Sequence, residues 1–594
     1  MKVLGLGNPF LRHAAAALVV DGELVAAVEE ERLTRSERAS PQLPLHAARY
    51  CLAEAGLDIE DVDRIAIPWS RETQRRDLTA FVRRMWRRQP LRALEAMRLA
   101  RRHKPTLEAF VHQLTQALAR PRSVGQSLAI PIAWVDSPIA QAAGAYHLSG
   151  WSHSAIICLG HAHQLVSTFL AEGRYGDIVP VQRIASPDSL DLFFSAVTEY
   201  LGFHSEPDLT MELATYGRPG GAGVSALIER RDTHRPSFRV HDALLNGREP
   251  WGIDAPHIPP VVLASLGTPA NGDVFSERYC DIAATAQHTL EQVVISFLDT
   301  ALRPALEFGR GRVCLTGTCA LNPRLNQRVL EHPLVHELWV PPAADESGTA
   351  VGAALWATHH GGGSIRPLRH PYLGPAYLDA EIARTLSELR IRHEHWPHGA
   401  IVDHVATLLA RGEVVGWFQG RLEFGPRTLG NRCVLANPAT PSSGREISER
   451  LKHTESWFRF TPAVTERNAR EVFEEGNPAP FARVTRTCRP KWRASLGQAV
   501  QSDGTCKPLV VSEASNPRFH ALLEAFEIRT GVPALLCTSL SRPREPLACS
   551  PADALATFFG SGLGFLALGD RLVSKAFDTA PEVSSEARTE DSKP

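Results

Sequence analysis

Residues 418–432 read FQGRLEFGPRTLGNR, and this stretch brings together three arginines, three glycines and one carboxylate. Glycine lets the backbone approach a ligand closely and adopt positive φ, and Pro426 stiffens the turn. Guanidinium groups pair through two hydrogen bonds with phosphate or carboxylate oxygens. The preceding run 414–417, VVGW, is typical of a buried strand. We interpret the stretch as a loop that this strand delivers to a cleft for an oxyanion ligand. The alternative is a surface loop laced with salt bridges.

The amino-terminal residues predict an α/β domain that opens with a hairpin. Residues 14–20 and 24–30 are apolar runs joined by Asp21-Gly22, a dipeptide that favours a tight turn between strands. Further elements are expected along the chain, namely helices at 44–55, 189–200 and 281–308 and a strand at 312–316. The third helix contains Pro304, where we expect a kink.

Bulk composition favours a globular intracellular enzyme of several domains. The chain has 594 residues, enough to bury large cores, and its formal net charge of -1 gives no global attraction to nucleic acid or to an anionic membrane. Its 10 cysteines include no Cys-x-x-Cys pair, so we expect reduced core residues and neither a disulfide framework nor a zinc site. No signal-like leader and no membrane-length apolar run is present, which makes the cytoplasm the expected location.

An arginine-rich segment at 75–104 predicts helices broken at Pro90. Its apolar residues recur at helical spacing and indicate one packed face: Leu78, Phe81, Val82, Met85 and Trp86. The basic face has three interpretations, which are a solvated surface, a dimer contact and a funnel for an anionic substrate.

A change of composition at 359–364, HHGGGS, predicts a linker between two domains. The expected division is a first domain over 1–360 with a helical insertion near 71–122, a linker at 361–366, a second domain over 367–578 and a disordered tail over 579–594.

Residues 418–432 resemble the signature FQGRMEFGPRALGNRS of the carbamoyltransferase family, whose nodulation-type and antibiotic-tailoring members move a carbamoyl group from carbamoyl phosphate to a hydroxyl. The resemblance covers nearly the whole chain. Its other motifs follow in the family's order: GLGNPFLRHAAAALVVDGELVAAVEEERLTR at 5–35, MELATYG at 211–217, GTCALN at 317–322 and SGTAVGAA at 347–354. The implied fold is an actin-like (ASKHA) N-terminal domain, of the class that includes tRNA threonylcarbamoyl transferase, followed by a YrdC-like α/β C-terminal domain.

The resemblance also implies a two-stage chemistry that uses ATP. In the YrdC-like domain carbamoyl phosphate is hydrolysed, and the carbamate attacks ATP to give carbamoyl-adenylate and pyrophosphate. In the N-terminal domain the acceptor hydroxyl then attacks the carbamoyl carbon and AMP leaves. Such a reaction needs cations for the phosphates and a base for the hydroxyl.

Individual residues carry these implied roles. His13 matches the histidine expected to deprotonate the acceptor, although its usual aspartate neighbour is Ala14 here. A histidine in a turn is also compatible with a purely structural role. The expected phosphate and carbamoyl phosphate ligands are Arg421, Arg427, Arg432, Lys452 and Lys507. The expected nucleotide contacts are Gly317, Thr318, Asn322, Asn326, Glu346 and Gly348.

The carbamoyl phosphate motifs depart from the family at several positions. KHRESFRPFAP has become KHTESWFRFTP at 452–462, so that Thr454 and Phe458 replace two arginines. The histidine of THVDGT is Gln501, and NTSFN reads CTSLS at 537–541. Lys507 stands where the family has arginine, which keeps the charge and loses the bidentate fork.

The family's iron site is altered further. Ser137 and Gln141 stand where the HHLAH helix supplies two histidines, and Leu159 stands at an aspartate position. A carboxylate survives near Gly348 as Glu346 or Asp345. We therefore predict no metal at the family's site, and the metal requirement of the reaction stays open. His161 and His163 alternate on an expected strand, either as a new ligand pair or as ordinary residues at a strand end.

Three functional hypotheses remain. The first is a carbamoyltransferase acting on a hydroxyl or amine of a small molecule, in a natural-product tailoring step. The second is an enzyme with a different donor or reaction on this scaffold, and the third is a catalytically silent paralogue acting as a partner. The acceptor is expected to be a small molecule, anionic or carrier-tethered. We expect no nucleic acid or membrane partner, and the resemblance suggests a homodimer.

Overall fold

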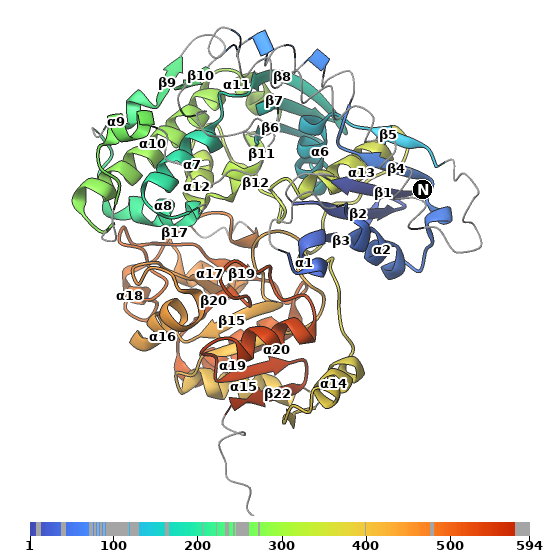
Figure 1. Ribbon diagram of the computed structural model, residues 1–594, viewed down its shortest axis with the longest axis vertical. Helices are drawn as coiled ribbons and strands as arrows, with labels where there is room; N and C mark the ends of the chain where they lie inside the picture. Colours follow the sequence, from blue (N-terminus) through green and yellow to red (C-terminus); the bar gives the residue numbers. More distant parts are fainter. Residues whose placement is uncertain are drawn as a thin grey trace, which may run out of the picture.

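The fold has two domains, one above the other in the computed structural model (Figure 1). Apart from isolated positions between 75 and 118 and residue 244, the structure describes residues 1–7, 13–36, 43–70, 130–160, 165–204, 206–220, 223–231, 237–241, 260–270, 274–397, 399–475 and 480–575. The prediction of an α/β protein is confirmed. Most of the expected arginine-rich helices, the 579–594 tail, His161 and His163 lie outside the described residues.

The first sheet of the N-terminal domain contains the predicted hairpin. Its strand order is β3-β2-β1-β4-β5, with β1 Lys2–Gly7, β2 Ala15–Val20, β3 Glu23–Glu29, β4 Arg64–Ile67 and β5 Ile132–Trp134. The turn between β2 and β3 has φ of 48° at Asp21 and 78° at Gly22, the conformation that this dipeptide favours. Helix α2 (Leu45–Glu54) is the helix that we expected at 44–55, and it packs on β2 and β3.

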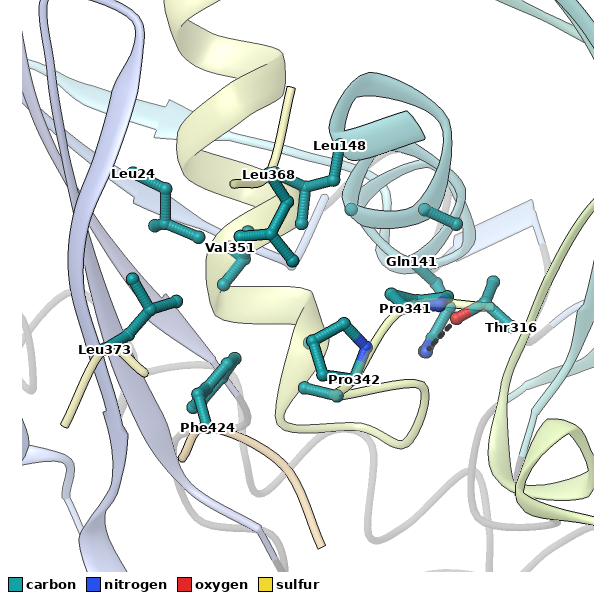
Figure 2. Close-up of a pocket in the computed structure, with 14 residues that line it drawn as sticks. Leu24, Gln141, Leu148, Thr316, Pro341, Pro342, Val351, Leu368, Leu373 and Phe424 are labelled. Atoms are coloured by element: carbon teal, nitrogen blue, oxygen red, sulfur yellow. Dashed lines mark hydrogen bonds between the residues drawn. The ribbon is translucent and has the colours of Figure 1, made fainter. Parts of the chain in front are cut away.

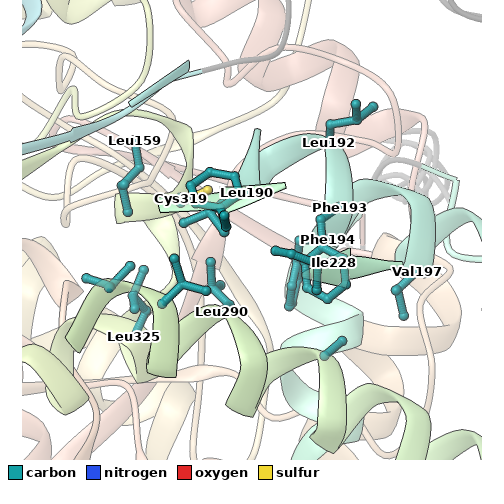
Figure 3. Close-up of a cluster of buried hydrophobic side chains, with 14 of the residues drawn as sticks. Leu159, Leu190, Leu192, Phe193, Phe194, Val197, Ile228, Leu290, Cys319 and Leu325 are labelled. Atoms are coloured by element: carbon teal, nitrogen blue, oxygen red, sulfur yellow. The ribbon is translucent and has the colours of Figure 1, made fainter. Parts of the chain in front are cut away.

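The second sheet carries the larger apolar core of this domain. Its order is β12-β11-β6-β7-β8, with β6 His153–Leu159, β7 Val166–Arg174, β8 Asp177–Ala185, β11 Arg312–Thr316 and β12 Glu337–Trp339. Helix α7 (Leu190–Tyr200), which we expected at 189–200, and α10 (Glu277–Asp299) pack their apolar faces together beside this sheet (Figure 3).

The helix expected at 281–308 is two helices. Helix α10 ends at Asp299, and α11 (Arg303–Phe308) begins after Thr300, Ala301 and Leu302. Pro304 lies in the first turn of α11, where its missing N–H costs no hydrogen bond. The proline therefore lies at the start of a new helix. The helical conformation is consequently interrupted between α10 and α11, where we expected a kink within one helix.

Two helices join the sheets at close range. Helix α6 (Ser137–Ser149) and α13 (Gly348–His360) cross where Gly144 meets Gly352. A Cβ atom at Gly352 would lie 1.7 Å from the carbonyl oxygen of Ala140, so only glycine allows this approach. After His360 the chain runs without a helix, through the predicted 361–366 linker, to α14 (Asp379–Glu388).

The C-terminal domain is an eight-stranded sheet covered on both faces. Its order is β13-β22-β21-β14-β15-β20-β16-β19, with β13 Glu394–His395, β14 Val415–Phe418, β15 Arg432–Ala436, β16 Thr461–Thr465, β19 Leu509–Val511, β20 Ala534–Ser539, β21 Phe565–Leu568 and β22 Arg571–Ser574. Helices α15 (Ala400–Ala410) and α19 (Pro517–Thr530) pack in one apolar cluster, and α14 and α20 (Pro551–Phe559) in another.

The arginine-rich stretch is the connection between the central strands β14 and β15. All four residues of β14 are buried, as the apolar run predicted, and β14 pairs antiparallel with β15. The connecting loop 419–431 contacts the N-terminal domain, where Arg421 donates to the Val25 carbonyl oxygen and the Gly425 N–H donates to Glu29. Among the described residues, no helix is both long and apolar enough to cross a membrane.

Candidate active site at the domain interface

The loop 419–431 takes its form from one buried carboxylate. Oε1 of Glu423 accepts hydrogen bonds from the backbone N–H groups of Leu429 at 2.7 Å, Asn431 at 3.1 Å and Arg432 at 3.3 Å. The Glu423 side chain is fully buried, so these bonds form away from water. The loop is therefore a fixed structure that presents its remaining side chains in set directions.

Two of the three loop arginines bind backbone carbonyls. Arg421 donates to the carbonyl oxygens of Val25 at 3.1 Å, Leu373 at 2.6 Å and Gly374 at 3.2 Å. Arg432 is fully buried, stacks 3.7 Å above the Phe418 ring and donates to four carbonyl oxygens, those of Gln419, Gly420, Asn431 and Pro375. Phosphate binding by these two residues stays a prediction, and their observed partners are structural.

The third loop arginine, Arg427, pairs with a carboxylate of the other domain. Both terminal nitrogens of Arg427 bond to Asp208, the second at 2.5 Å. Asp208 belongs to α8 (Pro207–Leu213), which Figure 1 shows on the side of the N-terminal domain that faces the C-terminal domain. Burial would raise the pKa of Asp208, but the Arg427 guanidinium lowers it below its usual value. Asp208 therefore stays ionised and holds Arg427 in a bidentate pair.

A second ion pair lies on the same helix. Nζ of Lys507 is 2.7 Å from Oε2 of Glu212, and the Gln501 amide donates to the same oxygen at 2.6 Å. Glu212 is fully buried. The Phe458 ring, in place of a family arginine, lies 4.4 Å from the Lys507 ammonium. The predicted phosphate ligands Arg427 and Lys507 are thus both brought to α8, each against one acid.

A buried arginine that the sequence analysis did not single out joins these charges. Arg483 is 1% exposed, and it donates to the carbonyl oxygen of Pro342. Burial and the neighbouring Arg427 lower the pKa of Arg483 to about 9, while Asp345 and Asp208 act in the opposite direction. Arg483 thus lies among charges from both domains.

Lys452 occupies a separate polar site in the C-terminal domain. Its Nζ donates to Ser539 Oγ at 2.7 Å and to the Ser541 carbonyl oxygen at 2.8 Å, and it is 3.2 Å from Ser541 Oγ. Burial lowers the pKa of Lys452 to about 7. The side chain of Lys452 therefore changes between its ammonium and neutral amine forms near neutral pH, in contrast to a surface lysine.

Asp345, in the segment before α13, is the acid that acts electrostatically on the predicted base. Burial raises the pKa of Asp345, and the interaction with His13 opposes that rise. Ala14 offers no carboxylate, so Asp345 is the candidate partner of His13.

The predicted nucleotide residues fall into two groups. Thr318 Oγ1 donates to Glu346 at 3.0 Å, and this contact places the turn after β11 beside the start of α13. Gly317, at φ 94°, and Gly348 lie in the same two segments, where a Cβ atom would meet the carbonyl oxygens of Leu159 and Ala343. These four residues are brought together as expected, and their nucleotide contacts stay a prediction.

The two asparagines make structural contacts, and their nucleotide contacts stay a prediction. Asn322 caps α12 (Pro323–Leu330) by accepting from the N–H groups of Arg324 and Leu325. Asn326 is fully buried and donates to the carbonyl oxygens of Ala320 at 2.8 Å and Arg483 at 2.6 Å. Asn326 thus ties α12 to the C-terminal domain.

The residues at the family's iron positions do not fit a metal ion. The Gln141 amide nitrogen donates to the carbonyl oxygens of Ala344 and Asp345, each at 2.9 Å. Leu159 has no donor atom, and Ser137 offers one neutral hydroxyl, a weak ligand compared with imidazole or carboxylate. Within the described ranges, no cluster of three or more His, Cys, Asp or Glu side chains could hold a metal.

An apolar pocket lies beside this position (Figure 2). It is lined by α6, α13, the segment after α13 and Phe424 of the arginine loop, and its empty volume is about 340 Å³, part of it open to solvent. Leu148, Val351 and Leu373 face its interior, while Gln141 and Thr316 close one end through a 3.2 Å hydrogen bond. No charged side chain is among the described residues that line the pocket. The two ion pairs described above lie where α8 meets Arg427 and Lys507.

Sequence reasoning missed the acids of α8 as partners of the cations. Asp208 and Glu212 are four residues apart, which places both on one face of a helix, and this spacing was a usable signal. Nothing in the sequence indicated Arg483, because its neighbours come from distant segments.

Comparisons with known proteins identify the family of this chain. The carbamoyltransferase N-terminus model matches residues 2–355, and the carbamoyltransferase C-terminus model matches residues 406–575. Nodulation protein NolNO of Sinorhizobium fredii is 32% identical over 581 residues, which cover 96% of this chain and 80% of that protein. An uncharacterized protein of Synechocystis sp. is 29% identical over 96% of both chains. A solved structure, component A of the Acidaminococcus fermentans (R)-2-hydroxyglutaryl-CoA dehydratase, has a TM-score of 0.34 and 14% identity over 61% of this chain and 99% of its own. The resemblance is confirmed, and the chain belongs to the carbamoyltransferase family.

Proposed function

We propose that this protein transfers a carbamoyl group from carbamoyl phosphate, through a carbamoyl-adenylate made with ATP, to a hydroxyl or amine of a small molecule. The observation that carries the proposal is that two predicted phosphate ligands of the C-terminal domain, Arg427 and Lys507, both meet helix α8 of the N-terminal domain. Cations suited to phosphate oxygens thus lie at the boundary between the two domains that share the reaction.

In the first stage the C-terminal domain handles the phosphate chemistry. Lys452 and the cations Arg427 and Lys507 supply positive charge for phosphate oxygens. Carbamoyl phosphate is hydrolysed to carbamate and inorganic phosphate. A carbamate oxygen then attacks the α-phosphorus of ATP, and pyrophosphate leaves with the two outer phosphates.

In the second stage the acceptor attacks the carbamoyl carbon beside the N-terminal domain. His13 takes the proton of the acceptor hydroxyl or amine, and the carboxylate of Asp345 stabilises the imidazolium that forms. The bond between the carbamoyl carbon and the AMP oxygen breaks. Thr318 and Glu346 lie where the leaving nucleotide is expected.

We further propose a cytoplasmic enzyme that acts as a homodimer in natural-product tailoring. Its acceptor is anionic or carrier-tethered, and nucleic acid and membranes are not partners. Iron is not bound at the position of Gln141, because an amide donor replaces an imidazole there.

A second candidate follows from the two ion pairs on α8. Asp208 and Glu212 neutralise cations that a phosphate would otherwise meet. This arrangement favours a donor other than carbamoyl phosphate, or a silent paralogue, if the acids never release the cations.

ATP–pyrophosphate exchange tests the proposal without knowledge of the acceptor. Exchange that depends on carbamoyl phosphate is the expected result, and Arg427→Ala should abolish it. The matched control is Arg303→Ala, which removes an exposed arginine paired only with Glu307. Folded protein without exchange would overturn the carbamoyl-adenylate mechanism and favour the second candidate.

A further inference from the structure

Helix α8 and the turn that follows contact the C-terminal domain along one face. Asp208 meets Arg427, and Glu212 meets Lys507. Thr215 accepts hydrogen bonds from Ser502 Oγ, at 2.6 Å to its carbonyl oxygen and 2.8 Å to its hydroxyl. The next residue, Tyr216, lies edge-on to Trp457, with ring centroids 6.3 Å apart. The spacing of four residues places the two acids on one side of α8, and Thr215 and Tyr216 extend the contact through the turn that follows.

The two acids have the chemistry of the ligand that the cations are expected to bind. A carboxylate carries negative charge on two oxygens, and it satisfies a guanidinium fork or an ammonium group as phosphate oxygens do. Each acid faces one cation, and Glu212 also takes the Gln501 amide. The two carboxylates of α8 therefore occupy the places where two oxyanion groups of a ligand would contact Arg427 and Lys507.

We propose that Asp208 and Glu212 are internal ligands of the interface cations, and that an external oxyanion binds only by replacing them. The expected occupant is a doubly anionic ligand of the polyphosphate class, because side chains four apart on a helix have Cβ atoms about 5–6 Å from each other. The identity of the natural ligand rests on the proposed function; the competition between acids and ligand does not.

Release of the acids does not unfold α8. Its opposite side is held in the core of the N-terminal domain, where Leu209 and Leu213 are buried and α8 packs on α7 and α10. Only the face that carries the two acids therefore changes partners when an external oxyanion binds.

Pyrophosphate binding to the full chain, measured by calorimetry, tests the competition directly. Asp208→Asn and Glu212→Gln should each bind pyrophosphate at least about tenfold more tightly than the wild type, a change of about 1.4 kcal/mol. The control Glu471→Gln, which removes an exposed partner of Lys491, should leave the affinity unchanged. Equal affinity in folded α8 variants and wild type would overturn the proposal.

A measurement on the unaltered protein covers the case in which the variants fail to fold. A crystal structure of the wild type with pyrophosphate should show the ligand's oxygens on Arg427 and Lys507 in place of the two carboxylates. A pyrophosphate complex in which Asp208 stays on Arg427 and Glu212 stays on Lys507 would overturn the proposal. Binding requires no turnover, so tighter binding without ATP–pyrophosphate exchange would keep this inference and reject the proposed reaction alone.

Discussion

Arg421 of the C-terminal domain donates a hydrogen bond of 3.1 Å to the carbonyl oxygen of Val25 in β3 of the N-terminal domain. An arginine from the predicted phosphate loop thus joins the two domains. The same guanidinium also binds the carbonyl oxygens of Leu373 and Gly374 in the connecting segment. The motif that marks the family therefore has an assembly role in addition to any ligand role.

Arg421→Ala should weaken the coupling between the domains. Hydrogen bonds from charged groups contribute roughly 1.5–3 kcal/mol each to stability. Water can hydrogen-bond to some of the carbonyl groups left exposed, so we expect the unfolding free energy to fall by about 2–3 kcal/mol. Scanning calorimetry should show the domain transitions moving apart. Arg303→Ala, at an exposed site, is the control and should leave them together. An unchanged calorimetric profile would rule out the assembly role.

Glu423→Ala should disorganise the arginine loop. Three backbone N–H groups would lose their buried acceptor, at roughly 1–3 kcal/mol for each unsatisfied group, so the total loss is at least about 3 kcal/mol. Urea unfolding measures the loss. Glu413→Ala, an exposed position just before β14, should change the unfolding free energy little. Equal effects of the two substitutions would contradict the role of Glu423.

Anion binding at Lys452 should strengthen as the pH falls from 8 to 6. Burial lowers the pKa of this lysine to about 7, so its ammonium form becomes dominant over this interval. Sulfate, whose charge is constant there, should bind up to about tenfold more tightly at the lower pH, following the protonated fraction. Lys452→Met should remove this dependence; if it persists in the variant, another group is responsible.

Glu29→Gln should stabilise the protein at pH 8 more than at pH 5. Glu29 accepts from the Gly425 N–H at 2.8 Å, and burial raises its pKa from 4.5 to about 7 although Arg32 opposes the rise. Its contribution to stability is full below pH 4.5 and is lost as the pH rises through 7. The glutamine amide oxygen at this position can accept the same hydrogen bond from Gly425 and carries no charge into the buried site. We expect the unfolding free energy at pH 8 to rise by up to about 3 kcal/mol.

The comparison uses urea unfolding at both pH values. Glu307→Gln, at a side chain that is 57% exposed, is the control and should show no such difference. A gain from Glu29→Gln that is the same at pH 5 and pH 8 would mean that Glu29 does not titrate in this interval.

Purified protein should contain iron well below one atom per chain. The amide of Gln141 donates to two carbonyl oxygens, and Leu159 offers no ligand atom. Elemental analysis after growth with added iron, followed by desalting, measures the content. Stoichiometric iron would contradict the interpretation of these positions.

Local patterns predicted the elements, because their signals lie within a few residues. The Asp21-Gly22 turn and the buried run before the arginine loop are set by backbone preference and by hydrophobicity. The break before Pro304 was harder to place, since a proline is compatible with a kink as well as with a new first turn.

The partners of the charged residues could not be predicted. Asp208 and Arg427 are 219 positions apart in the chain, and only the docking of the domains brings them together. Arg421 and Arg432 carry the same side chain as Arg427, yet both donate to backbone carbonyls, and the carboxylate near Arg421 is that of Glu54. Which partner a guanidinium meets depends on tertiary structure, whereas the sequence shows only its charge.

The contact between Gly144 and Gly352 has a mechanical consequence. At this crossing backbone packs directly against backbone, and this close contact between α6 and α13 holds the two sheets of the N-terminal domain together. We therefore expect them to move as one rigid block and not as jaws that open and close. Displacements during a reaction cycle would then arise where this block meets the C-terminal domain, at a boundary crossed by the Arg427–Asp208 and Lys507–Glu212 ion pairs.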